Sequence, residues 1–236
     1  AAGRAAASAA EAAAEGEHAK RRWAATKRVR TREAEEAAWA ATQAARSASW
    51  LQAARAAQAE AVASARTAAE ERCERSSDWA YVGTATRTYR VLERSERALR
   101  ECAAKVEATA AAWTSERCDA AAAWKRKRVE AAEAWRESEM RCADDFRREL
   151  FTGVAERLAS RHGKEKWQEH GSAAVLERLH ADRGAMRELA EGGAKDEIAR
   201  VNTAESDAAD EARKAAATAC AEAHAATDEA VVKAKA

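Results

Sequence analysis

Large apolar side chains recur along this chain at intervals of eleven residues. The two groups that show this step are Trp39 with Trp50, and Trp113, Trp124 and Trp135 with Phe146. Three turns of an α-helix take up about 10.8 residues, so each step returns to nearly the same helix face. The chain contains no proline and about three residues in ten are alanine, the strongest helix former. The pattern therefore predicts long helices that carry few large side chains.

Glycines and clusters of turn-forming residues supply the only predicted helix ends. These signals lie at residues 76–84, 161–163, 171–172 and 192–193. They predict helices over residues 19–75, 85–160 and 165–235, with the third helix broken near 171 and 192. The predicted fold is all-α, an elongated antiparallel bundle of about three very long alanine-rich helices. Its parts are an alanine-rich leader (1–18), a long helical hairpin (19–160, turning near 79–84) and return helices (161–236).

The tryptophan steps allow two registers for the first hairpin. Pairing residues whose numbers sum to 163 places Trp50 against Trp113, whereas a sum of 174 places Trp50 against Trp124. The first register sets Glu35 opposite Arg128, and the second sets Glu35 opposite Glu139. Because opposite charges attract, we favour the first register.

A second hairpin about Gly163 pairs residues whose numbers sum to 326. Met140 then meets Met186, and Phe151 meets Val175. The segment 146–190 is richer in large apolar residues than the rest of the chain, so we expect it to pack best. A short heptad run, consisting of Leu92, Leu99, Val106 and Trp113, supports the second helix.

The tryptophan and leucine positions are interpreted as packing or interaction residues. An aromatic binding face is the alternative, but alanine opposite tryptophan lets helices approach closely while the rings fill the gaps. The residues assigned to packing or interaction are Trp39, Trp50, Trp113, Trp124, Trp135, Phe146, Leu176, Leu179, Met186 and Leu189.

Charge is high but balanced, with 41 basic and 40 acidic residues and a net charge of +1. No global field therefore favours nucleic acid or an anionic membrane. One local basic patch lacks acidic residues and contains Trp23; it consists of Lys20, Arg21, Arg22, Lys27, Arg28, Arg30 and Arg32. An acidic partner could bind this patch, whereas salt bridges between helices are the simpler interpretation.

Residue patterns for catalysis or metal binding are weak. Glu177-x-x-His180 matches the pair that di-iron helical bundles use, but the pattern arises easily in a glutamate-rich chain, and His180 is expected to be a partly buried packing residue. Phosphate-binding loops, dinucleotide fingerprints and nucleophile elbows are absent from the sequence. We expect no catalytic residue, no metal and no cofactor.

The five cysteines are widely spaced and odd in number, which favours a reducing compartment. With no apolar run long enough to span a membrane, we expect a soluble protein, with the cytoplasm or cytoskeleton favoured. A mitochondrial or cell-surface location is the alternative. A mitochondrial location would require a targeting segment before Ala1.

Alanine-rich helices with eleven-residue spacing resemble the peripheral-stalk subunit of rotary ATP synthases. Long alanine-rich three-helix rods also resemble the surface proteins of trypanosomes. These likenesses imply an organelle-complex subunit or a surface receptor or binding module, respectively. The function we favour is a non-enzymatic structural scaffold, a subunit of a filamentous or other large assembly of cytoskeletal or axonemal type, whose partners are other protein subunits.

Overall fold

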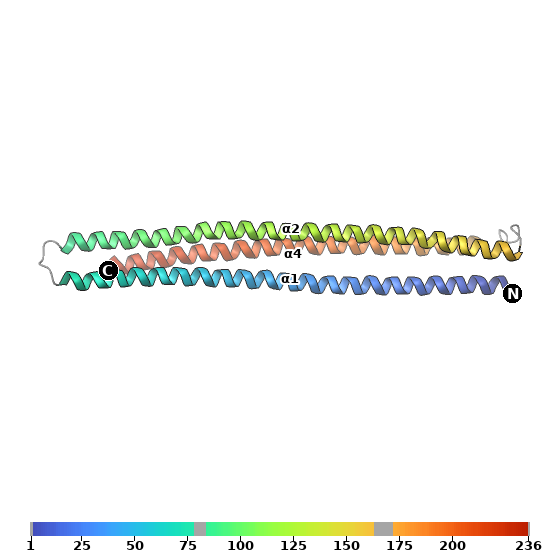
Figure 1. The fold of residues 1–236 in the computed structure, drawn as a ribbon, viewed down its shortest axis with the longest axis horizontal. Coiled ribbons are helices and arrows are strands. Elements are labelled where there is room, and N and C mark those ends of the chain that lie inside the picture. Colours follow the sequence, from blue (N-terminus) through green and yellow to red (C-terminus); the bar gives the residue numbers. More distant parts are fainter. Residues whose placement is uncertain (1, 78–83, 163–171, 236) are drawn as a thin grey trace. The chain divides into compact units, whose positions relative to one another are not determined.

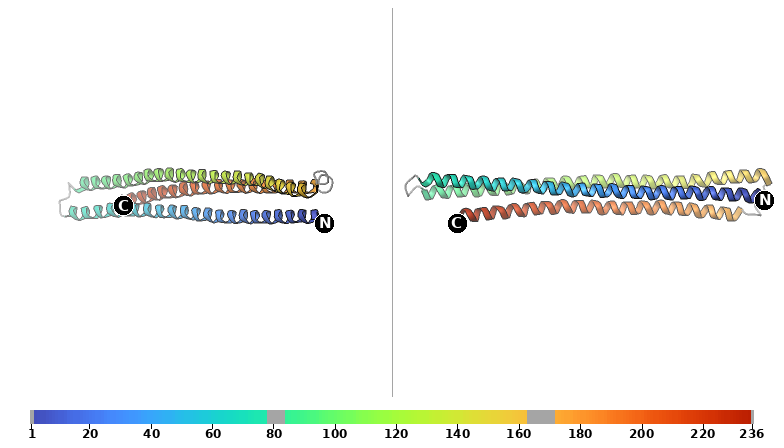
Figure 2. Two further views of the ribbon diagram at one scale, coloured as in Figure 1. Left: turned by 45° about the vertical axis from the view of Figure 1, so that its right-hand side comes forward. Right: turned by 90° about the horizontal axis from the view of Figure 1, so that it is seen from below.

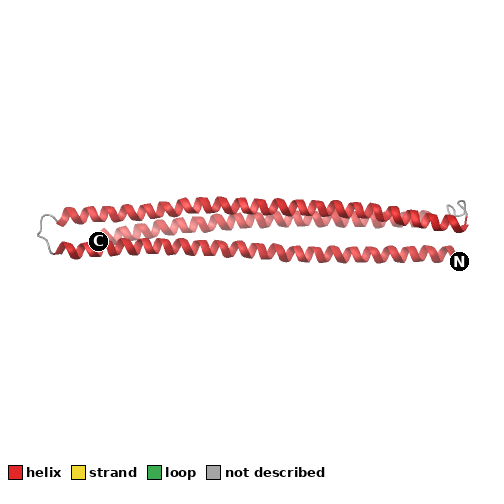
Figure 3. Ribbon diagram, viewed as in Figure 1, coloured by secondary structure: helices red, strands yellow, loops and turns green. Residues whose placement is uncertain are grey.

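Long helices account for all of the chain that is described. The computed structural model describes residues 2–77, 84–162 and 172–235, and within these ranges the side chains near several helix ends, including 146–179, lie outside the description. Helix α1 spans Ala2–Ser77, α2 spans Thr84–His162 and α4 spans Ser172–Lys235 (Figure 1). No strand occurs among these residues (Figure 3). The all-α prediction is therefore confirmed, and α1 already begins within the segment predicted as a leader.

The predicted break of the third helix near 192 is wrong. Helix α4 continues through Gly192 and Gly193. A Cβ atom added to Gly193 would lie only 3.2 Å from the indole ring of Trp135, whereas one added to Gly192 would meet nothing within 4 Å. Gly193 therefore makes room for a neighbouring ring, and a helix tolerates such a glycine at a cost of about 1 kcal/mol. The other predicted break, near 171, lies outside the described residues.

The chain divides into two compact units, each built from segments of all three helices. Unit 1 comprises residues 1–37 and 124–203, and unit 2 comprises residues 38–123 and 204–236. In each unit the segments of α1, α2 and α4 lie side by side, as the turned views in Figure 2 illustrate. The two units are described separately below.

Unit 2 confirms the register in which paired residue numbers sum to 163. The rings of Trp50 and Trp113 are stacked, with centroids 4.6 Å apart and planes 13° from parallel. Further along, Gln58 on α1 meets Cys102 on α2, so the two helices are antiparallel. Arg55 of α1 bonds to Glu222 of α4, and Gln58, three residues further along α1, bonds to Thr227, which lies further along α4. The two helices are therefore parallel.

Small side chains fill the interior of unit 2. The buried cluster consists of Ala103, Val106, Ala219 and Ala223, with Trp50, Leu51 and Ala54 packed against it. Leu99 and Val106 of the predicted heptad run are buried, while Leu92 lies outside the described side chains. A fully buried alanine removes little apolar area from water, so the half-buried tryptophans carry much of the apolar contact.

Unit 1 has the same helix directions and the same register. Arg28 of α1 lies over the ring of Trp135 of α2, 4.0 Å from its centroid, and Glu35 of α1 bonds to Arg128 of α2. The numbers of both pairs sum to 163. The buried apolar residues here are Ala132, Ala143, Met186, Ala190, Ala194 and Val201. Charged side chains are buried among them, and they form the site described next.

Candidate functional site at the basic segment of α1

Three of the seven residues of the basic patch turn inward and pair with acidic residues of unit 1. Arg28 lies 3.1 Å from Glu197, and Arg32 lies 3.9 Å from the same carboxylate. Arg21 lies 3.8 Å from Glu139 of α2. For these residues the interhelical salt-bridge interpretation is confirmed.

Glu197 is the most buried charged residue of the network, with only 2% of its surface exposed. Its carboxylate faces Arg28 and Arg32 of α1 and lies 3.8 Å from Arg128 of α2. One of its oxygens, Oε1, accepts no hydrogen bond in the described part of the chain and is held only by the longer ion pairs. A buried carboxylate needs such cationic neighbours, because an unpaired charge in this position costs several kcal/mol.

A second buried carboxylate, Glu36, extends the network. Arg128 lies 3.4 Å from Glu36 and donates a 2.6 Å hydrogen bond to Glu35, and Arg200 of α4 lies 3.2 Å from Glu36. Arg200 also donates to Glu33 at 3.2 Å. The network balances arginine against glutamate and draws on all three helices. Its members are Arg28, Arg32, Arg128, Arg200, Glu33, Glu35, Glu36 and Glu197.

The pKa values of the network follow from burial and pairing. Burial lowers the pKa of Arg28, and the nearby Glu197 opposes this effect. The hydrogen bond from Arg128 holds the pKa of Glu35 below its ordinary value. These pairings tie Arg28 and Glu35 of α1 to Glu197 of α4 and Arg128 of α2, respectively.

The remaining residues of the patch point outward and surround an exposed tryptophan. Trp23 is 66% exposed, and the ammonium of Lys27 lies 5.2 Å from the centroid of its ring. Arg22 and Arg30 are exposed as well, and so is Lys20. Trp23, Lys27 and Arg30 follow the spacing i, i+4, i+7 and therefore share one helix face. We call these three residues the Trp23 stripe.

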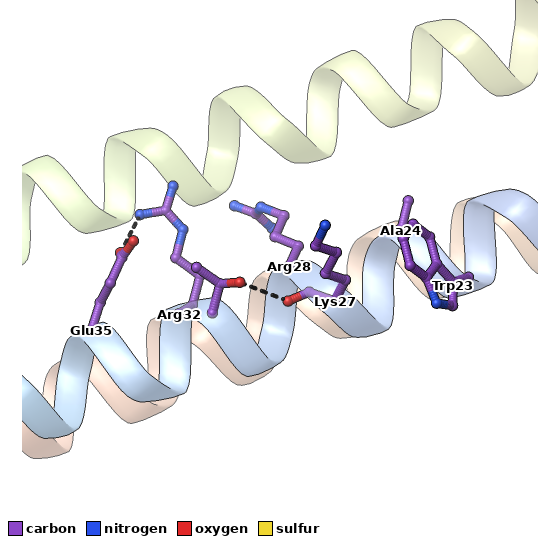
Figure 4. Close-up of a pocket in the computed structure, with 7 residues that line it drawn as sticks. Trp23, Ala24, Lys27, Arg28, Arg32 and Glu35 are labelled. Carbon is purple, nitrogen blue, oxygen red and sulfur yellow. Dashed lines mark hydrogen bonds and ion pairs between the residues drawn. The ribbon is translucent and has the colours of Figure 1, made fainter.

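A shallow hollow of about 430 Å³ lies beside this stripe (Figure 4). Its lining comes entirely from α1, namely Trp23, Ala24, Lys27, Arg28, Thr31, Arg32 and Glu35. In the close-up Arg32 and Glu35 are joined by an ion pair, 3.0 Å long, at the end away from Trp23. The hollow offers an aromatic face beside cationic groups.

The packing residues have different environments. Five tryptophans are half-buried, Met186 is buried and Leu189 is 39% exposed. Phe146, Leu176 and Leu179 have side chains outside the described part, as do Phe151 and Val175. The five tryptophans are Trp39, Trp50, Trp113, Trp124 and Trp135.

In the described residues, no group of three or more histidine, cysteine or acidic side chains is arranged so that it could hold a metal ion. The side chain of Glu177 lies outside that part. His180 is exposed, so its predicted role as a partly buried packing residue is wrong. Four cysteines, Cys102, Cys118, Cys142 and Cys220, are free thiols. Burial raises the pKa of Cys220, with a smaller contribution from Glu107, and this makes that thiol a weaker nucleophile.

Sequence reasoning missed the buried polar residues Glu197 and Gln58. Glu197 continues a 3–4 spacing through Ala190, Ala194 and Val201, which are all buried. A charged residue within a stripe of apolar residues was the sequence feature that could have indicated a buried charge. In a chain so rich in alanine and glutamate, however, several helix faces carry a similar pattern.

No protein-family model, curated protein or solved structure significantly matches this chain. Within the part of the chain described, none of the helices has an apolar stretch sufficient to cross a lipid bilayer.

Proposed function

We propose that this chain is a non-enzymatic scaffold subunit that joins other protein subunits in a larger assembly, with a filament or cytoskeletal complex as the favoured type. The observation that carries the proposal is the division of the basic segment of α1. Its inward residues hold the helices of unit 1 together, whereas its outward residues present Trp23 and cations to the surroundings. A large exposed ring beside cations is typical of a protein contact surface.

The interior supports the same proposal. Among the side chains that the structure describes, the buried ones are mostly alanine, and polar and charged groups such as Glu197 and Gln58 are buried with them. A buried alanine removes little apolar area from water, so contacts with partners would add stability. A surface receptor and a stalk subunit of an organelle complex share these features; the partner recovered in the experiment below would distinguish them.

Leu189 provides a test of scaffold function, because it is a large apolar residue that is 39% exposed on α4. We expect Leu189→Glu to reduce incorporation into the native particle several-fold while lowering Tm by only a few degrees. Incorporation is measured by size-exclusion chromatography of native extracts that contain tagged protein, and Tm by circular dichroism. Met186→Glu, at a buried position on the same helix, is the matched control and should lower Tm strongly.

Elution of the wild-type tagged protein as a free chain in native extracts would contradict the scaffold proposal. Normal incorporation of Leu189→Glu together with a large drop in Tm would show instead that Leu189 serves the interior.

A further inference from the structure

We propose that the Trp23 stripe binds a second copy of this chain, through the acidic segment 203–212 of α4. The inference rests on the proposed scaffold function and names its partner. Each copy would then offer one basic surface on unit 1 and one acidic surface on unit 2. Such a contact joins two different surfaces, so it can be repeated from copy to copy.

The cations of the stripe are available for a partner. Lys27 and Arg30 are exposed, and neither forms an ion pair with any described residue. The nearest exposed acids on the same helix, Glu33 and Glu35, are already engaged by Arg200 and Arg128. The stripe therefore carries uncompensated positive charge around an exposed indole.

The acidic segment has the opposite character. Residues 203–212 contain Glu205, Asp207, Asp210 and Glu211 but no lysine or arginine. Asp207 and Glu211 are exposed, stand one helical turn apart and form no ion pair within the described ranges. Asp210 is partly satisfied by Arg213, 2.7 Å away. The residues between the acids are alanine and serine, so a neighbouring helix can approach closely.

The spacing of the two surfaces matches. Lys27 and Arg30 are three residues apart, Asp207 and Glu211 are four apart, and both spacings correspond to about one turn of helix. Two helices side by side can therefore form two ion pairs at once. The small side chains around Asp207 leave a flat surface for the ring of Trp23. The net charge of +1 means that copies do not repel one another strongly.

A second copy fits this stripe better than a lipid surface does. Helices that lie on membranes insert a continuous apolar face, and cations flank it. Here Trp23 is the only large apolar residue of the stripe, and Lys27 lies directly over its ring. Charge complementarity with another helix requires no inserted face.

The experiment uses two neutralised variants of the full chain and sedimentation velocity. Lys27→Gln with Arg30→Gln removes the basic surface, and Asp207→Asn with Glu211→Gln removes the acidic one. We expect the wild-type chain to associate at low salt and to dissociate as NaCl rises from about 0.05 to 0.5 M. The association constant of each variant alone should be lower than that of the wild-type chain by about tenfold or more. A mixture of the two variants should restore association as a one-to-one complex that grows no further.

Matched controls remove equal charge elsewhere. Arg94→Gln with Lys105→Gln and Glu60→Gln with Glu101→Gln change exposed residues of unit 2 outside the acidic segment, and both should associate like wild type. Trp23→Ala should weaken association while leaving Tm within about 2 °C of wild type, because its ring is largely exposed.

A wild-type chain that stays monomeric at low salt would overturn the inference, and so would equal association of wild type and both variants. Binding of a monomeric chain to vesicles of phosphatidylcholine and phosphatidylserine, lost in Trp23→Ala, would assign the stripe to a lipid surface instead. A monomeric purified chain that still enters a large particle in native extracts would leave the scaffold proposal standing while this inference fails.

Discussion

Single charged residues decide how the helices of unit 1 hold together. Glu197 combines near-complete burial with three arginine neighbours from two helices. Replacing both members of a buried ion pair by apolar residues is often neutral, whereas removing one member leaves an uncompensated charge. The loss of stability caused by a substitution in this network therefore depends on whether it leaves a buried charge without its partner.

We expect Glu197→Ala to lower the free energy of unfolding by about 3–5 kcal/mol, because Arg28, Arg32 and Arg128 lose their shared counter-charge. Urea denaturation followed by circular dichroism measures the change. Glu191→Ala, at an exposed position on the same helix, should change it by less than about 0.5 kcal/mol. The double variant Glu197→Leu with Arg28→Met removes both members of the closest pair, while Arg32 and Arg128 keep Glu35 as a partner. It should be more stable than Glu197→Leu alone, and equal or lower stability would argue against an electrostatic cause.

Acidic pH should weaken the structure through carboxylates paired with arginine. Hydrogen bonds from Arg128 and Arg55 lower the pKa values of Glu35 and Glu222, respectively, below the ordinary value of 4.5. A depressed folded-state pKa contributes stability that is fully present above the unfolded-state value and is lost as pH falls through the folded-state value. We therefore expect the free energy of unfolding to decrease as pH falls below about 4.5 and to continue falling until both carboxylates are protonated.

Urea midpoints measured across this pH range test the expectation. The double variant Glu35→Gln with Glu222→Gln should show a shallower pH dependence than wild type, and identical curves would refute the role of these two pairs.

At the scale of the elements, spacing was sufficient to predict helices and their pairing. The absence of proline and the few turn-forming clusters predicted the end of α1, both ends of α2 and the end of α4 closely, whereas α1 begins at Ala2 and not near residue 19. The eleven-residue tryptophan steps, together with Glu35 and Arg128, indicated the observed register. The role of Gly193 was not predictable, because a glycine pair in a sequence has the same appearance whether it ends a helix or accommodates a ring.

The two adjacent glycines of α4 offer a matched comparison. Gly192→Ala should raise the free energy of unfolding by about 0.5–1 kcal/mol, since alanine favours the helix and the added Cβ meets open space. Gly193→Ala should raise it less or lower it, because the added Cβ would press on Trp135 at 3.2 Å. Thermal melts of both variants check the order, and a larger gain for Gly193→Ala would show that the ring moves away freely.

At the scale of the whole molecule, the division into two compact units bears on how it unfolds. Each unit has its own interior, with buried charges in unit 1 and the stacked Trp50 and Trp113 in unit 2. We expect the purified chain to be highly helical and to melt over a broad range rather than in one sharp step. In calorimetry the measured enthalpy should exceed the van't Hoff enthalpy. A single sharp transition that is independent of concentration would contradict this expectation and weaken the scaffold proposal.

The alanine-rich interior also has a consequence for alignment. Because one alanine layer is much like the next, sliding a helix by eleven residues would exchange alanine for alanine at many positions and change apolar burial little. The side chains that distinguish one alignment from another are the polar ones inside. Gln58 donates to the carbonyl of Ala223 and to Thr227 and accepts from Cys102, and after such a slip these partners would be gone. Buried polar groups in this protein thus select one alignment among several of nearly equal packing, much as a single asparagine does in a coiled coil.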